Sequence, residues 1–482
     1  MNTPDILNKM RNQRLPLIFL TLYFLIPLLI LPLGRDTYTE WIFPRVILVF
    51  LLGLAGLLLF RQEFLKINRI ALISASGYLA LVLLSDLSSP DELAFRVVGH
   101  EERYDGLIYQ IGKTLAFLTA VVTLRKLRQT HADFAYRLVG TGFFVIASIQ
   151  ALLLATQFFL KTDMIGFLLY EGQKNTAPIG TVGFKVLLIL SIGTGLLFAL
   201  VEYSKGWNLA PIFLAFMAGL AAGRASAIGL VTSLVSGAWL YFNKRKAGKA
   251  LLFLAAATTF SLAFVFRNEI LSPFGVQPVK VLSARTLKTR FVIWKITGRL
   301  LETHRWLVIR GYGSDAMRYL LIENLPKDER LKKLYIESMV MENKLPADKV
   351  EDLEIVTQKE YGLRATALHL VYRTQQEPDR TKHFLAAVNL DKAHNLWLDL
   401  WLRYGLLATI LYTILAFGPF FYLARRLLKS QLDDWWPRAA TWVVLALMAH
   451  GIHYLAWFPM PLWEPLFLLI AALGWDLVDY KR

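Results

Sequence analysis

Apolar stretches long enough to cross a lipid bilayer recur along this chain of 482 residues. A transmembrane helix needs about 20 apolar residues, because the hydrocarbon core is about 30 Å thick and each helical residue advances about 1.5 Å. About twelve such segments are predicted, at residues 16–33, 44–60, 69–87, 106–124, 136–160, 182–201, 207–223, 226–242, 249–266, 404–424, 437–457 and 459–476. Only 18% of the residues are charged, whereas soluble proteins have about 25%. The sequence therefore predicts an all-α polytopic membrane protein.

The basic residues between these segments predict the orientation of the chain. Cytoplasmic connections of membrane proteins are enriched in lysine and arginine. If the N-terminus is cytoplasmic, every second connection holds a basic cluster, such as RKLR at 125–128 or KRKAGK at 244–249. The short connections on the other side hold few basic residues. This alternation predicts an even number of spans, two cytoplasmic termini, and an outer location for the one large hydrophilic segment, residues 267–394.

Three regions follow from this arrangement: residues 1–266 with nine spans, the outer loop 267–394, and residues 395–482 with the last three spans. Apolar residues recur at helical spacing in two parts of the loop, at Leu331, Leu334, Tyr335 and Met339 and at Leu363, Ala367, Leu370 and Val371. Both patterns predict amphipathic helices. Such helices either cover the membrane surface or pack within a domain of their own, and the spacing is compatible with both.

Composition and motifs narrow the chemistry. The chain has no cysteine, which excludes disulfides, thiolate catalysis and cysteine-based metal sites. It has no P-loop, no Rossmann fingerprint and no zinc-binding histidine spacing, so we predict a reaction that needs neither metal nor cofactor. The net charge of +17 follows in part from the topology. The remainder favours an anionic ligand or anionic lipid headgroups over nucleic acid.

Arg224 is the first candidate site residue. It lies in AAGRASAIG, at a predicted outer turn between two apolar spans. The small residues around it allow close backbone packing, which would direct the guanidinium group into a cavity. An ionisable group in a membrane domain is costly and usually functional. The alternative is an arginine that extends to the lipid headgroups.

A second group of arginines lies in the basic segment 282–317. Arg290 and Trp294 are four residues apart and share a helix face. Arg285 and Arg310 add positive charge nearby. Guanidinium groups bind phosphate oxygens in pairs, so a pyrophosphate is the expected ligand. The alternative is a basic outer loop with no bound anion.

The third candidate is His394, in the stretch DKAHNLWLDLWLRYG at 391–405. Asp391 is the predicted N-cap, which would place His394 in the first helical turn. The positive end of the helix dipole favours the neutral imidazole, which can accept a proton as a general base does. The alternative is a histidine that only caps the helix or lies at the membrane interface.

Four stretches together resemble the O-antigen ligase and O-antigen polymerase superfamily of bacterial inner-membrane glycosyltransferases. They are AHNLWLDLWLRYG at 393–405, RFVIW leading to RGYG at 290–313, GRASAIG at 223–229 and GHEERYDGL at 99–107. The ligase pattern has His-Asn, nine residues and Gly, which His394, Asn395 and Gly405 match. After this glycine and two further residues, the pattern has Gly, Thr or Tyr. This chain has Ala408 at that position, the third after Gly405, and Thr409 comes one residue late. Residues 180–185, GTVGFK, lack the asparagine-containing stretch of many relatives.

The resemblance implies a bacterial inner-membrane enzyme whose large helical loop is periplasmic. Such an enzyme transfers a glycan from undecaprenyl pyrophosphate to an acceptor hydroxyl, with inversion and without metal. His394 would be the catalytic base, and Arg224, Arg290 and Arg310 would bind the donor diphosphate. Supporting roles fall to Asn395, Arg103 and Arg285.

A ligase that uses a glycan or lipid A–core acceptor is the favoured interpretation, because one outer loop dominates. Membrane lipids are the other expected partners. A polysaccharide polymerase and a protein O-oligosaccharyltransferase of the same superfamily stay open. A transporter for lipid-linked glycans would instead place ionisable groups near the bilayer midplane and show related halves.

Overall fold

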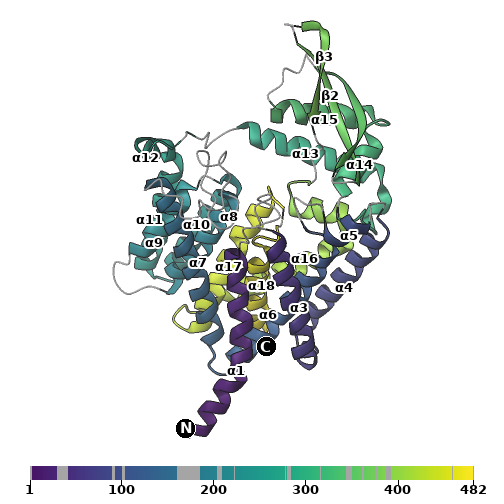
Figure 1. Ribbon diagram of the computed structural model, residues 1–482. Coiled ribbons are helices and arrows are strands. Elements are labelled where there is room, and N and C mark those ends of the chain that lie inside the picture. The colour runs from purple at the N-terminus through teal and green to yellow at the C-terminus, as the bar shows by residue number, and fades with distance from the viewer. Residues whose placement is uncertain are drawn as a thin grey trace.

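The computed structural model describes residues 3–29, 42–89, 93–99, 104–159, 185–202, 209–221, 223–276, 278, 284–314, 316–343, 350–360, 363–374, 377–386, 392–458 and 460–480. The described chain is predominantly helical. Figure 1 shows a bundle of long helices, with the segment 284–386 projecting from one end of it. The end marks of the chain lie toward the opposite end of the bundle in this view.

Each predicted apolar segment overlaps one long helix of the described chain. These helices are α1 (Thr3–Leu25), α3 (Phe43–Phe64), α4 (Arg69–Leu87), α6 (Leu107–Arg128), α7 (Phe134–Phe159), α8 (Lys185–Glu202), α9 (Leu209–Leu220), α10 (Arg224–Asn243), α11 (Ala247–Val265), α16 (Leu396–Leu427), α17 (Trp435–Tyr454) and α18 (Glu464–Tyr480). Seven helices of the described chain, α3, α4, α6, α7, α10, α11 and α16, are long and apolar enough to cross a membrane. The chain is thus a helical membrane protein, and the total of twelve spans stays a prediction.

Helix α6 is the most buried of these seven, and small residues let α3 approach it closely. A β-carbon added at Gly53 would lie 2.7 Å from the carbonyl oxygen of Gly112. One added at Gly112 would lie 2.7 Å from the α-carbon of Phe50. Close backbone contact of this kind replaces the hydrophobic driving force that helices lack inside a bilayer. It holds the start of α6, from which part of the site is built.

The projecting segment has a small core of its own. Its helices are α13 (Ala284–Thr303), η5 (Arg305–Val308), α14 (Ala316–Asn324) and α15 (Glu329–Asn343), whereas α12 (Arg267–Leu271) and η4 (Ser272–Phe274) follow α11 and stay with the bundle. Ile296, Leu320 and Leu331 are among the residues buried in this core, which also includes Leu402 of α16. The helix predicted around Leu331 and Tyr335 is confirmed as α15, and both side chains are buried.

The second amphipathic helix predicted in the loop is wrong. Residues 363–371 lie instead in β2 (Leu363–Thr374), which pairs antiparallel with β1 (Val350–Glu360) and β3 (Glu377–Ala386). The sheet order is β1-β2-β3, and Thr357 faces Thr366 in the register. Apolar residues at 363, 365 and 367 also fit the two-residue period of a strand. The neighbouring strands supply the backbone partners that decide between the two periods.

Candidate active site

Helix α16 is broken at Gly405, and the RGYG turn of the loop (310–313) packs against this break. Gly405 has φ 87° and ψ 166°. This backbone conformation is not helical, and its positive φ favours glycine. The carbonyl oxygens of Leu402 and Arg403 accept hydrogen bonds from the amides of Tyr312 and Gly313, at 2.9 Å each. The RGYG turn therefore replaces part of the hydrogen bonding of α16 just after His394.

Glycine is required on the loop side of this contact as well. A β-carbon at Gly311 would overlap the backbone of Arg403 and Tyr404. The backbone of the loop therefore contacts the backbone of α16 directly, with no side chain between them. The neighbouring Tyr312 donates a hydrogen bond of 2.8 Å to the carboxylate of Glu323. Partial burial and this carboxylate raise the pKa of the Tyr312 phenol, which keeps it a donor. The turn is thus fixed by backbone and side chain together.

Substitution of Gly311 by alanine is expected to lower the free energy of unfolding by about 1–3 kcal/mol, because the added methyl group must displace rigid backbone. Thermal unfolding of the detergent-solubilised protein measures the change. Gly298 of α13 is the matched control, since a β-carbon there meets nothing within 4 Å. Its replacement by alanine is expected to be neutral or slightly stabilising. Equal melting temperatures for the Gly311 variant and wild type would contradict the interlocking of the two motifs.

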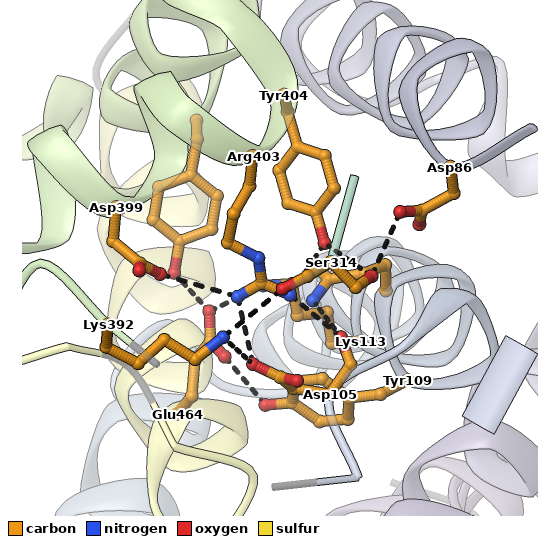
Figure 2. A network of polar contacts seen from close by, with 12 residues as sticks. Asp86, Asp105, Tyr109, Lys113, Ser314, Lys392, Asp399, Arg403, Tyr404 and Glu464 are labelled. Carbon is orange, nitrogen blue, oxygen red and sulfur yellow. Dashed lines mark hydrogen bonds and ion pairs between the residues drawn. The ribbon is translucent and has the colours of Figure 1, made fainter. Parts of the chain in front are cut away.

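A buried network of charges joins this region to the bundle (Figure 2). The carboxylate of Asp105 pairs with Lys392 and with Arg403, at 2.9 Å each, and all three side chains are at most 7% exposed. Arg403 also lies 3.4 Å from Asp399 and donates a hydrogen bond of 2.8 Å to the hydroxyl of Tyr404. Lys392 is two residues before His394. The network therefore fixes the backbone that carries the histidine.

The network continues toward α18. Glu464 at the start of α18 pairs with Lys113 of α6 at 2.7 Å and accepts a hydrogen bond of 2.8 Å from Tyr109. On the other side, Ser314 donates a hydrogen bond of 3.0 Å to Asp86 at the end of α4. Charges within a membrane domain are stable only when they are paired. The sequence interpretation missed these residues, although Lys113 and Glu464 stand inside predicted apolar segments, which is the signal that could have found them.

The structure corrects the predicted start of α16. Asn395, not Asp391, is the N-cap, and its side-chain oxygen accepts hydrogen bonds from the amides of Trp397 and Leu398. Asp391 lies outside the described residues. His394 precedes the cap in a left-handed conformation with φ 50°, so it is not in the first helical turn. The helix begins later because the asparagine is the residue whose side chain reaches the second and third amides.

His394 and Arg290 meet at one tryptophan, Trp457, which follows α17. The His394 ring lies edge-on to the Trp457 ring, with centroids 5.6 Å apart. The guanidinium carbon of Arg290 lies 5.0 Å from the centroid of the same ring. Phe458 contacts His394 as well, at 5.4 Å. His394 and Arg290, which are about a hundred residues apart in the sequence, thus contact the same aromatic side chain.

Hydrogen bonding determines which nitrogen of His394 can act as a base. Nδ1 lies 3.1 Å from the carbonyl oxygen of Lys392. A carbonyl oxygen only accepts, so Nδ1 carries the proton in this bond and Nε2 of the neutral ring has the lone pair. Asn395 donates a further hydrogen bond of 2.9 Å to the carbonyl oxygen of Leu455, which ties the cap to the end of α17. The cap and the network thereby orient the ring.

Arg224 lies at the start of α10, two residues before Ser226. The hydroxyl of Ser226 is 3.0 Å from Nδ1 of His453, four residues before Trp457. Arg224 is therefore at the same end of α10 as the His394 site.

Arg310 is exposed and has other neighbours than Trp457. It lies 5.8 Å from the ring of Trp306 and donates a hydrogen bond of 3.4 Å to the carbonyl oxygen of Ser88. Arg285 is in α13, but its side chain lies outside the described residues, as does all of Arg103. Of the predicted site residues, the structure thus brings His394 and Arg290 into contact with one side chain and leaves Arg310 at the loop surface.

Comparisons with known proteins add no assignment: no family model matches the chain, and no curated protein is significantly similar to it.

Proposed function

We propose that this protein transfers a glycan from undecaprenyl pyrophosphate to an acceptor hydroxyl, in the manner of an O-antigen ligase. The observation that carries the proposal is the meeting of His394 and Arg290 on Trp457. A base and a guanidinium group that contact the same tryptophan ring suit a reaction that removes a proton from an alcohol while a diphosphate leaves. The motif resemblance points to the same reaction.

The reaction balances with the residues available. The acceptor oxygen forms a bond to the anomeric carbon, and its proton passes to Nε2 of His394. The bond between the anomeric carbon and the diphosphate oxygen breaks, and its electron pair leaves with the diphosphate. Attack from the face opposite the leaving group inverts the anomeric centre. Arginine side chains placed before the reaction stabilise the charge that grows on the leaving group, so no metal is required.

The proposed arrangement in the membrane follows the charge pattern of the sequence. We propose twelve spans in the bacterial inner membrane, cytoplasmic termini, and a periplasmic loop that includes α13 to α15 and the sheet. The loop meets the bundle in the first part of α16, the helix that follows His394, because its RGYG turn donates hydrogen bonds to Leu402 and Arg403. A donor with a long polyprenyl tail would then keep its tail in the bilayer and present its diphosphate near Arg290.

The test is glycan transfer by purified protein in vesicles that contain undecaprenyl pyrophosphate-linked glycan and lipid A–core. We expect a new glycosidic bond and release of undecaprenyl pyrophosphate, also with a chelator present. Transfer to a growing polysaccharide or to a protein, with none to lipid A–core, would identify the polymerase or the oligosaccharyltransferase. Movement of donor across the vesicle membrane without a new bond would refute the enzyme and identify a transporter.

Replacement of Arg290 by alanine is expected to lower the transfer rate about 10²–10³-fold, the usual effect of removing one charge-stabilising donor. Lys288 of the same helix is the matched control, because its side chain is exposed and its replacement removes the same charge. Its alanine variant is expected to keep the wild-type rate. If both variants slow transfer equally, Arg290 acts only through the net charge of the loop and the proposed diphosphate contact is wrong.

A further inference from the structure

His453 is a buried histidine with one nitrogen left over. It lies in the last turn of α17 and is fully buried, as is Ser226 of α10. Nδ1 lies 3.0 Å from the hydroxyl of Ser226, which fixes the ring between two helices. Nε2 is also buried and has no hydrogen-bond partner in the described part of the chain. The His453 ring is therefore held through Nδ1, and its Nε2 is the atom that can bind a ligand.

His450, one turn earlier on α17, shows how this protein treats a buried histidine that only packs. Its Nδ1 is 2.8 Å from the carbonyl oxygen of Ala446, and its Nε2 accepts a hydrogen bond of 2.9 Å from Trp463. Both nitrogens of His450 are satisfied. A buried polar group without a partner destabilises the folded state, so the contrast with His453 calls for a function.

Trp457 presents a second polar atom of the same kind. Its indole Nε1 is buried and has no hydrogen-bond partner among the residues that the structure describes. Its ring lies 6.4 Å from that of His453 and carries the guanidinium group of Arg290 on its face. The His453 ring and the guanidinium group of Arg290 thus both lie beside an indole whose own nitrogen is buried.

We infer that His453 and Trp457 form, with Arg290, a binding site for a phosphate group of a prenyl diphosphate. The Ser226 hydroxyl donates to Nδ1 of His453, so Nε2 carries the hydrogen and donates to a phosphate oxygen. Indole Nε1, which is only ever a donor, binds a second oxygen. Arg290 supplies the charge, and hydrogen bonds to ionised oxygens are the strong ones. This inference deepens the proposed function and rests on it for the identity of the ligand.

The experiment measures binding of geranylgeranyl diphosphate to the full-length protein in detergent, without any transfer reaction. His453→Asn keeps a group for Ser226 but has none at the Nε2 position, and Trp457→Phe removes the indole N–H but keeps an aromatic ring. We expect each to raise the Kd about tenfold to hundredfold, the usual effect of losing a hydrogen bond to a charged group. His453→Gln places an amide near the Nε2 position and is expected to restore most of the affinity.

Two controls match these variants in burial and position. His450→Asn and Trp475→Phe alter satisfied side chains, since Trp475 donates its indole hydrogen to the carbonyl oxygen of Leu415. Both are expected to bind as wild type does. Should His453→Asn fail to fold, Trp457→Phe still decides the question. Wild-type affinity in Trp457→Phe, or equal losses in the controls, would overturn the site.

Competition separates the sources of a phosphate group. Inorganic phosphate and phosphatidylglycerol are expected to displace geranylgeranyl diphosphate only weakly, and equal displacement by either would overturn the assignment to a prenyl diphosphate. Binding also separates this inference from the proposed function. Wild-type protein that binds the diphosphate but transfers no glycan would refute the enzyme and leave the site intact. Transfer by wild type together with unchanged binding in both site variants would refute only the site.

Discussion

Replacement of His394 by alanine is expected to lower the kcat of glycan transfer about 10²–10⁴-fold, the usual contribution of a general base. The alcohol of the acceptor is a weak nucleophile, and Nε2 is the atom that would take its proton. Binding of geranylgeranyl diphosphate by this variant should stay near that of wild type, because the donor diphosphate is held by other residues. Steady-state rates with purified protein, at saturating donor, measure the loss.

The pH dependence distinguishes a base from a packing residue. A base works in its neutral form, so the wild-type rate should fall as the pH is lowered and the ring becomes protonated. The alanine variant should lose that fall, and added imidazole should restore part of its rate. His131, which follows α6 at the far end of that helix, is the control, and its alanine variant should turn over as wild type does. Normal turnover by His394→Ala would refute the general-base role.

Replacement of Asp105 by asparagine is expected to lower the free energy of unfolding by about 3–5 kcal/mol, because it leaves buried cations without their partner. Asp105 neutralises both Lys392 and Arg403, and the one ion pair that Arg403 would keep within the described residues is the longer one with Asp399. Thermal and denaturant unfolding in detergent measure the change. Glycan transfer should fall too, since the network holds the backbone before His394.

A surface pair provides the control for this loss. Asp133 and Arg137 lie one turn apart at 2.6 Å, but the arginine side chain is 57% exposed. Asp133→Asn is expected to change the free energy of unfolding by less than about 1 kcal/mol. The double variant Asp105→Asn/Lys392→Met should recover part of the stability, because it removes one of the stranded charges. If Asp105→Asn unfolds as wild type does, the network is not what holds this region together.

The helices of the bundle could be predicted from the sequence for a physical reason. A chain inside a bilayer must satisfy its backbone hydrogen bonds within itself, so a sufficiently long apolar segment has few alternatives to a helix. Each predicted apolar segment overlaps one long helix among the described residues. The loop has no such constraint. There the spacing of Leu363 and Ala367 fitted a helix and a strand equally, and pairing with β1 and β3 decided for the strand.

The residues of the candidate active site could be predicted from the sequence only in part. Arg290 and His394 stand out because their neighbours form short motifs, whereas Trp457 and His453 carry no local signal. Their roles come from contacts such as that between Ser226 and His453, which are 227 positions apart. The same is true of Asp105, whose partner Lys392 is 287 positions away.

What the sequence determined by itself is therefore local: which segments are helices in a membrane, and which glycines stand in the two motifs. The tertiary structure decided the partners. It moved the cap of α16 to Asn395, placed the RGYG turn on the carbonyls freed at Gly405, and brought His394 and Arg290 to Trp457. Hydropathy adds up along the chain, but a site is made by side chains that meet only after the helices have packed.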